Sequence, residues 1–315
     1  MTGDAGPGPD RDRALLDLLA RLEAAGYDFV MPTLATHGHV ARRRDRARAG
    51  NLRDVFGWTR AFAPGDLAAD LLDLARRADA VRAGENGLWT MSVRASRIDG
   101  RLCLHSARND AEDAVFLGPD SYRFVRLIAE TLQDGAPVRR AFDIGTGAGT
   151  GALAVAARRP GAQVHGGDVN PQALRLLAIN AGHAGLDVVP VHGPALEAVD
   201  GAFDLIVANP PYIAGRGGRL YRDGGDRHGS ALALDWVRTG LRRLTPGGRF
   251  VLYTGAPVVD GVDVVRAALG PLAEDGIVLD YRELDPDVFG DMLRRPEYAD
   301  VERIAAVGAV LTRRC

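Results

Sequence analysis

The chain carries a tetrapeptide, Asn209-Pro210-Pro211-Tyr212, whose residue types suit chemistry at a nitrogen atom. It directly follows the apolar run 203–208, which is typical of a buried strand, and open α/β sheets keep their reactive groups at the carboxyl ends of strands. The Asn209 side-chain oxygen and the Pro210 carbonyl can accept the two N–H groups of an amide or amine and so direct the nitrogen lone pair. Two consecutive prolines fix this part of the backbone.

A glycine-rich segment lies upstream of the tetrapeptide. The apolar strand Phe142-Asp143-Ile144 opens into a turn with glycines at 145, 147, 149 and 151, followed by an alanine-rich helix. Glycines allow a close approach of backbone and ligand, because side chains there would collide with it. Asp168 ends the next predicted strand, roughly twenty residues on, where a carboxylate can accept both hydroxyl hydrogens of a ribose. These features predict a nucleoside cofactor, and a nicotinamide dinucleotide would use them equally.

From Ala111 onward the chain alternates short apolar strands with helical stretches. This alternation predicts an α/β domain over residues 113–315, with a mostly parallel sheet covered by helices on both faces. A turn at 245–248 (Thr-Pro-Gly-Gly) is expected to precede one of the strands. The seven strands are expected to begin near Ala141, Gln163, Val188, Phe203, Arg249, Val278 and Arg303.

Residues 1–112 follow a different pattern and predict a smaller N-terminal helical and β-hairpin domain. Extended segments within 89–106 flank Asp99-Gly100, a dipeptide that suits a tight hairpin turn. This domain either caps the substrate site or grips nucleic acid as a winged reader. Residues 1–13 are expected to be a mobile tail. Two stretches show apolar residues at helical spacing: Leu15, Leu16, Leu19 and Leu22, then Leu67, Leu71, Leu74 and Ala75.

Composition excludes several classes of protein. The formal net charge of -2 over 315 residues gives no broad cationic field, which disfavours tight binding of nucleic acid. No apolar run approaches the roughly 20 residues that span a bilayer. The two cysteines, Cys103 and Cys315, indicate neither a disulfide framework nor a thiolate metal site, and a cytoplasmic location fits. His37 and His39 lack companion ligands, so no metal is expected.

On the residues described above, the chain resembles the class I S-adenosylmethionine-dependent methyltransferases. Residues 143–212 carry the resemblance, which extends over about 113–315, and the tetrapeptide is similar to that of amino-methyltransferases acting on glutamine amides or adenine amines. By motif, the release-factor glutamine methyltransferases are the most similar family, and residues 116–121 occupy the place of that family's segment before the first strand. The resemblance implies a Rossmann-like seven-stranded methyltransferase sheet and S-adenosyl-L-methionine as cofactor.

The resemblance also implies the roles of individual residues. Catalytic roles fall to Asn209, Pro210 and Tyr212. The Tyr212 ring could stack on a planar acceptor or shield the sulfonium from water, or it could be a half-buried aromatic that packs under a loop. Where many relatives carry an Asp that meets the adenine amine, this chain reads His192-Gly193-Pro194-Ala195, so that contact is replaced or lost. The implied cofactor-binding residues are Asp143, Gly145, Thr146, Gly147, Gly149, Asp168, Asn170 and Asn209.

A glycine-rich loop after the tetrapeptide carries further candidates for substrate binding. Asp223 and Asp226, joined by Glu283 and Asp285 near the end of a later predicted strand, could bind a cationic substrate or be solvated charges. His228 could accept the proton released after transfer or be a surface histidine.

The leading hypothesis is N-methylation of a planar amide or guanidine nitrogen on an amino-acid-like small molecule or a protein glutamine. A first alternative is methylation of an adenine amine in nucleic acid, gripped by the N-terminal domain. A second alternative is a non-catalytic protein that binds S-adenosylmethionine. Nothing in the surface pattern indicates an oligomeric state.

Overall fold

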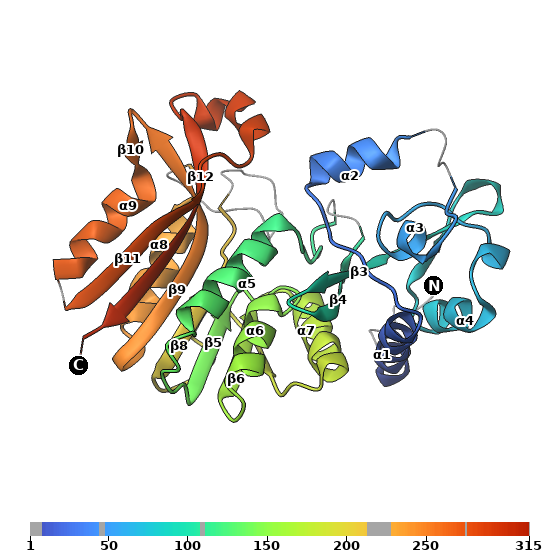
Figure 1. Cartoon of the computed structure of the whole chain (residues 1–315), viewed down its shortest axis with the longest axis horizontal. Coiled ribbons are helices and arrows are strands. Elements are labelled where there is room, and N and C mark those ends of the chain that lie inside the picture. Colours follow the sequence, from blue (N-terminus) through green and yellow to red (C-terminus); the bar gives the residue numbers. More distant parts are fainter. Residues whose placement is uncertain (1–7, 44–47, 108–110, 213–227, 275, 315) are drawn as a thin grey trace, which may run out of the picture.

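The computed structural model describes residues 8–43, 48–107, 111–212, 228–274 and 276–314 (Figure 1). Within these residues, seven strands lie side by side in the order β11-β12-β9-β8-β5-β6-β7, and the short β10 adds an eighth against β9. The predicted seven-stranded α/β sheet is therefore confirmed. The strands are β5 Arg140–Ile144, β6 Gln163–Asp168, β7 Val189–His192, β8 Phe203–Ala208, β9 Leu244–Val259, β10 Val262–Asp263, β11 Ile277–Asp285 and β12 Arg303–Arg313.

The strand order changes direction at β5. Its neighbours β6 and β8 both run parallel to it, as do β7 and β9 further out, whereas β12 is antiparallel to β9 and β11. Because β5 connects to β6 on one side while β8 lies on its other side, a crevice opens at their carboxyl ends. Asp143, Asp168 and Asn209 all lie at or directly beyond these ends.

Helices cover both faces of the sheet, as the alternating pattern predicts. Along β8, Leu205 and Val207 pack into one cluster of buried residues, and Ile206 and Ala208 pack into the other, because successive side chains on a strand point to opposite faces. The first face carries α5 Pro119–Thr131, α6 Thr150–Arg158 and α7 Pro171–Ala184, and the second carries α8 Ala231–Leu241 and α9 Val264–Leu269. Short 3-10 turns follow at η4 Gly270–Glu274, η5 Gly290–Arg294 and η6 Pro296–Tyr298.

The N-terminal region has the predicted helices and hairpin. Asp99 and Gly100 have φ angles of 50° and 77°, the two positive values that a two-residue hairpin turn requires. Helices in this region are α1 Pro9–Ala24, α2 Leu34–Ala41, α3 Leu52–Phe56 and α4 Ala69–Arg77, with 3-10 turns η2 Pro64–Asp66 and η3 Glu85–Gly87. Its strands are β1 Val81–Ala83 paired with β2 Trp89–Met91, and β3 Val93–Ile98 paired with β4 Arg101–Ser106.

Two predicted boundaries are wrong. The expected tail over 1–13 ends earlier, because α1 begins at Pro9, a residue suited to the first helical position, and Asp12 pairs with Arg175 at 2.5 Å. The strand expected at Arg249 begins at Leu244, which pairs with Phe203 before residues 245–248 shift the register. In both cases a partner distant in sequence extends the element.

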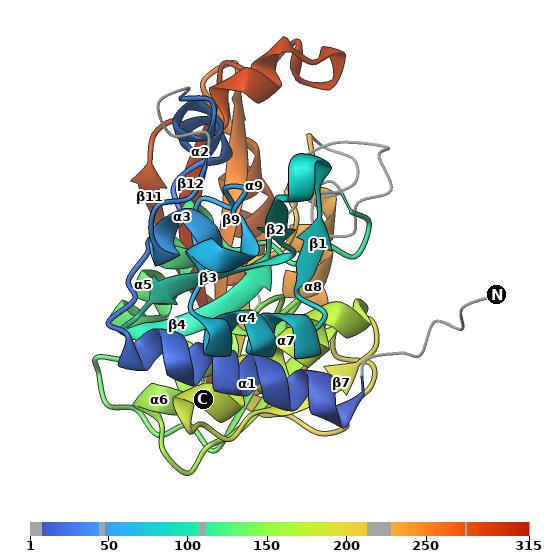
Figure 2. The same ribbon diagram turned by 90° about the vertical axis from the view of Figure 1, so that its right-hand side faces the viewer.

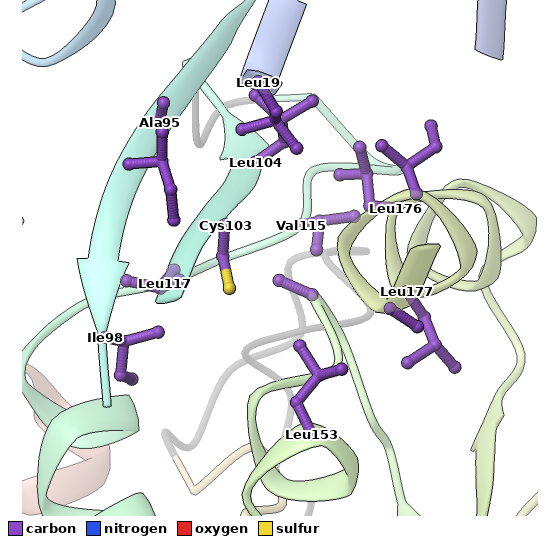
Figure 3. Packing of buried hydrophobic residues seen from close by; sticks show 14 of the residues in the cluster. Leu19, Ala95, Ile98, Cys103, Leu104, Val115, Leu117, Leu153, Leu176 and Leu177 are labelled. Atoms are coloured by element: carbon purple, nitrogen blue, oxygen red, sulfur yellow. The ribbon is translucent and has the colours of Figure 1, made fainter. Parts of the chain in front are cut away.

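One hydrophobic core joins the N-terminal region to the sheet. Helix α1 runs alongside α4 and α7 (Figure 2). Figure 3 shows Leu19 of α1 and Leu104 of β4 among the side chains of α6 and α7, including Leu153 and Leu176. Cys103 of β4 is buried in the same cluster, where burial raises the pKa of its thiol to about 12.

Asn180 of α7 provides a polar link within this core. Its side-chain oxygen accepts the Leu104 N–H at 2.8 Å, and its amide nitrogen donates to the carbonyls of Leu104 at 3.0 Å and Ala148 at 2.9 Å. The residue has no solvent exposure. Asn180 therefore ties the N-terminal hairpin to the glycine-rich turn after β5.

We expect the Asn180→Leu substitution to lower the free energy of unfolding by roughly 3–5 kcal/mol, because it leaves three buried backbone groups without partners. Urea denaturation measures the change. Ala178→Leu places the same side chain at an exposed position of the same helix and should change the value by less than about 0.5 kcal/mol. Equal effects of the two substitutions would contradict the proposed link.

No helix within the described residues is both long and apolar enough to cross a membrane. Among the same residues, no group of three or more His, Cys, Asp or Glu side chains is arranged to hold a metal ion. His37 instead packs against Trp58, with ring centroids 5.4 Å apart.

Candidate functional site

A cleft of about 1090 Å³ opens at the carboxyl ends of β5, β6 and β8. Nine of the residues singled out in the sequence line it: Asp143, Gly145, Thr146, Gly147, Asp168, Asn170, Asn209, Pro210 and Tyr212. They come from three separate stretches of the chain. The fold therefore brings the tetrapeptide and the predicted cofactor residues other than Gly149 into one site.

Asp143 lies near the carboxyl end of β5, where its side chain organises the glycine-rich turn. Its Oδ2 atom accepts hydrogen bonds from the Thr146 hydroxyl at 2.7 Å and from the Ala152 backbone N–H at 2.8 Å. Only 2% of the residue is exposed, and this burial raises the pKa of the carboxyl to about 7, although both hydrogen bonds oppose the rise. The Asp143 carboxyl therefore changes its ionisation state near neutral pH.

Asp168 holds the other side of the same turn. Its Oδ2 atom accepts the Gly147 N–H at 3.0 Å, and its Oδ1 atom accepts the Asn170 N–H at 2.9 Å. Burial raises the pKa of this carboxyl, while these backbone hydrogen bonds oppose the shift. A carboxylate has about four acceptor positions, so each oxygen can still accept a hydroxyl group from a ligand in the cleft.

Asn170 has a structural position at the edge of the cleft. It caps α7, since its side-chain oxygen accepts the Gln172 N–H at 2.9 Å, and its amide nitrogen donates to the Asp113 carbonyl at 2.9 Å. The cap orients the start of α7 next to Asp168. Asn170 thus supports the Asp168 carboxylate and connects β6 to the segment before α5.

Glycine is required at two positions of the turn for different reasons. At Gly145, with φ of 66°, a Cβ atom would lie 2.6 Å from the Trp236 ring. At Gly149, with φ of 87°, it would lie 2.5 Å from Leu177 of α7. Gly149 is not among the cleft-lining residues, so it serves helix packing, whereas Gly145 faces the cleft beneath Trp236.

The tetrapeptide forms another part of the cleft wall. Asn209 is half-buried and Pro210 is buried, directly after β8. The Tyr212 ring packs on β9, where a Cβ atom at Gly255 would lie 2.6 Å from it, and its centroid is 5.7 Å from that of Phe289. Burial and the nearby Asp120 carboxylate raise the pKa of Tyr212 well above its usual range. Tyr212 is therefore a neutral, well-packed side chain.

Sequence reasoning assigned no site role to several contributors to the cleft, among them Asp120, Trp236 and Phe289. Phe289 has a positive φ of 60°, uncommon for an aromatic residue, and this conformation accompanies its contact with Tyr212. Trp236 lies on the face of α8 that lines the cleft, together with Leu232, Asp235 and Thr239. The helical spacing of these four residues was the signal available in the sequence.

Other predicted substrate contacts are not brought to the cleft. Glu283 is exposed on β11 and pairs with Arg303 of the neighbouring strand at 2.9 Å, and it is not among the lining residues. Asp285 pairs with Arg123 at 2.7 Å. His228 contacts Asp300 at 2.9 Å. Asp223 and Asp226 lie outside the residues that the structure describes.

The remaining walls come from both ends of the chain. The N-terminal region contributes residues 33–35 at the start of α2, and the segment before and within η5 contributes 287–292. On the side of β7, Gly193, Pro194 and Ala195 line the cleft at the place where the resemblance leads us to expect an Asp, and Glu197 follows on the same side. Glu197 is thus the cleft-lining carboxylate nearest in sequence to that place.

Comparison with known proteins finds a family model that matches the part of the chain carrying most of this cleft. Residues 120–254 match the sequence model of the methyltransferase small domain, which is a little under half of the chain. This match confirms the resemblance to methyltransferases inferred from residues 143–212. It includes the glycine-rich turn, Asp168 and the tetrapeptide.

Curated relatives of this chain carry the name release factor glutamine methyltransferase, and three of them show the extent of the similarity. The chain is 40% identical to that of Deinococcus radiodurans over 124 residues, 36% of this chain and 44% of the relative. It is 50% identical to that of Xylella fastidiosa over 135 residues, 42% of each chain. For Neisseria gonorrhoeae the identity is 32% over 180 residues, 55% of this chain and 64% of the relative. The chain thus spans less than half the length of the first two.

Proposed function

We propose that this chain, whose residues 120–254 belong to the methyltransferase small domain family, methylates the side-chain amide nitrogen of a protein glutamine. The observation that carries the proposal is the shared cleft, in which the Asn209-Pro210-Pro211-Tyr212 tetrapeptide lies with Asp143 and Asp168. The names of the three relatives support glutamine as the acceptor. The activity follows from these residues rather than from the fold alone.

The cleft residues fit S-adenosylmethionine as the methyl donor. Asp168 has acceptor positions for the ribose hydroxyls, and Gly147, which lines the cleft with open space at its Cβ position, allows the close approach of a ligand. Asp143 lines the same cleft and would supply a carboxylate for the cationic methionine portion. When bound, the cofactor supplies a methyl group on a positively charged sulfur.

The tetrapeptide would prepare the acceptor nitrogen. The lone pair of an amide nitrogen is delocalised into the carbonyl group. The nitrogen therefore reacts poorly unless the protein favours the pyramidal form, in which the lone pair is localised. The Asn209 side-chain oxygen and the Pro210 carbonyl can accept these two N–H groups, which orients the lone pair. Pro210 is buried, and the following proline restricts the backbone further, so these acceptors need little reorganisation.

The N-terminal region acts in this proposal as a substrate cap. Residues 33–35 of the N-terminal region and 287–292 of the C-terminal region line the cleft and frame the place where an acceptor side chain enters. We propose the boundary between the two parts of the chain at residues 112 and 113. Methylation of a small molecule or of an adenine amine remains a distinct outcome of the test below.

The test is incubation of the purified protein with methyl-labelled S-adenosylmethionine and a bacterial extract, then with purified release factors. Protease-sensitive label that mass spectrometry assigns to a glutamine supports the proposal. Label in the small-molecule fraction, or nuclease-sensitive label, would replace protein glutamine by another acceptor. Saturable cofactor binding with no label in any fraction of either incubation would point to the non-catalytic alternative.

Cofactor affinity should depend on pH through Asp143. Because the pKa of this carboxyl is raised to about 7, a rise from about pH 6 to about pH 8 ionises it and should tighten binding of the cationic cofactor roughly threefold to tenfold. The same raised pKa destabilises the ligand-free fold at neutral pH. The contribution of this carboxyl to the free energy of unfolding declines as the pH rises from about 4 to about 7.

Calorimetric titration at several pH values measures this dependence. Asp143→Asn is the matched control, since one oxygen accepts both the Thr146 and Ala152 hydrogen bonds and an amide oxygen can replace it. The variant should show weaker binding and a flatter pH profile. An unchanged pH profile in Asp143→Asn would assign the dependence to another group.

A further inference from the structure

A buried polar network lies directly behind the tetrapeptide. Asp120, in the first turn of α5, is 4% exposed, and its Oδ1 atom accepts the hydroxyl of Tyr253 at 2.7 Å. The same carboxylate raises the pKa of the nearby Tyr212 hydroxyl, with which it lines the cleft, and is 3.5 Å from an Arg123 nitrogen. Arg123 in turn pairs with Asp285 at 2.7 Å. The network thus joins α5, β9, β11 and the tetrapeptide.

The partners of Asp120 explain why a carboxylate is kept at this buried position. An ionised carboxylate out of contact with water is strongly unfavourable unless hydrogen bonds and opposite charge compensate it. The Tyr253 hydroxyl and the Arg123 guanidinium supply that compensation here. Because a carboxylate only accepts hydrogen bonds, it orients the Tyr253 hydroxyl toward itself and favours the same orientation for the nearby Tyr212 hydroxyl.

The network restricts Tyr212 from one side, and apolar contacts restrict it from others. The absence of a side chain at Gly255 admits the Tyr212 ring against β9, and Phe289 lies across from it with rings tilted by 58°. Both Asp120 and Phe289 line the cleft together with Tyr212. Tyr212 is separated from Asn209 by two prolines only, so its anchoring fixes the tetrapeptide at both ends.

We propose that Asp120 and Tyr253 are positioning residues that hold Tyr212, and through it the Asn209 and Pro210 acceptors, in the orientation that binds the acceptor nitrogen. This inference rests on the proposed function for its effect on rate. Its structural part, the anchoring of Tyr212, concerns the protein without any substrate. The two parts can therefore be measured separately.

The kinetic test compares Tyr253→Phe and Asp120→Asn with the wild-type enzyme. Tyr253→Phe removes one hydroxyl and keeps the ring, and it should lower kcat about tenfold, because small displacements of catalytic groups cost this much or more. Asp120→Asn introduces donors that face other donors and should lower kcat further. The dissociation constant of S-adenosylmethionine should stay within about twofold of the wild-type value.

A second tyrosine–aspartate pair provides a matched control. Tyr281 of β11 donates to Asp263 at 2.6 Å, and neither residue lines the cleft. Tyr281→Phe removes the same kind of hydrogen bond and should leave kcat unchanged even if the melting temperature falls as in Tyr253→Phe. Equal losses of kcat in the two variants, or an unchanged kcat in Tyr253→Phe, would overturn the inference.

The structural test does not depend on activity. Fluorine NMR of protein in which 3-fluorotyrosine replaces the seven tyrosines reports on each ring, and Tyr212→Phe assigns the Tyr212 resonance. Tyr253→Phe should shift or broaden that resonance, and Tyr281→Phe should not. An unmoved resonance in Tyr253→Phe overturns the anchoring of Tyr212. A displaced resonance in a protein that methylates no acceptor would support the anchoring and reject the proposed function.

Discussion

Replacement of Asn209 by Ala is expected to lower the rate of methyl transfer at least about a thousandfold. The Asn209 side-chain oxygen is one of two acceptors proposed for the amide N–H groups, and its loss leaves the nitrogen free to stay conjugated and unreactive. Asn209 lies directly after β8, whose residues 205–208 pair with β5 and β9, so the change should leave the sheet intact. Binding of S-adenosylmethionine should weaken only a few-fold, since Asp143 and Asp168 remain.

Single-turnover measurement of label transfer to the acceptor checks this expectation. Asn209→Asp keeps an oxygen acceptor in the same place and should retain more activity than Asn209→Ala, although its charge alters the site. Calorimetric titration of the cofactor with each variant separates binding from chemistry. A rate within tenfold of wild type for Asn209→Ala would remove this residue from the mechanism.

Replacement of Asp168 by Ala is expected to weaken cofactor binding about a hundredfold or more. Two proposed hydrogen bonds from ribose hydroxyls to a charged group are lost, and each such bond contributes about 1.5–3 kcal/mol. The backbone N–H groups of Gly147 and Asn170 also lose their acceptor, so the turn that forms the binding surface loosens. The effect should appear in the dissociation constant, with the rate at saturating cofactor much less affected.

Calorimetric titration against S-adenosylmethionine and S-adenosylhomocysteine measures the loss. Asp168→Asn keeps one acceptor oxygen for the turn and should lie between the wild-type protein and Asp168→Ala. Glu197→Gln tests the exposed carboxylate on the β7 side and should weaken binding no more than about tenfold, because a solvent-accessible contact contributes less. Wild-type affinity in Asp168→Ala would require a different location for the ribose.

Local pattern predicted much of the fold. Strands β6 and β12 begin at the predicted residues Gln163 and Arg303, and the hairpin turns at Asp99-Gly100, because side-chain alternation and turn chemistry are properties of neighbouring residues. The clustering of Asp143, Asp168 and Asn209 was predictable for a related reason. Each lies at or directly beyond the carboxyl end of a strand, and parallel strands place these ends at one edge of the sheet.

Features that depend on distant pairing were not predictable in this way. The hydrogen bond between Asp120 and Tyr253 joins residues 133 positions apart. Glu283 looked free to bind a substrate, yet the antiparallel register of β11 and β12 gives it Arg303 as a partner. The start of α1 at Pro9 likewise reflects the contact between Asp12 and Arg175. Sequence spacing carries no information on such partners.

The core shared by the N-terminal region and the sheet has a consequence for engineering and for evolution. A recognition domain on a linker can be exchanged between enzymes, because its removal exposes little apolar surface. Here the removal of α1 and the β3–β4 hairpin would expose α7 and the buried Asn180. Chimeras that join residues 113–315 to another N-terminal region should therefore aggregate unless α7 is redesigned with the graft. Substrate preference in this architecture changes through substitutions along the cleft more readily than through exchange of modules.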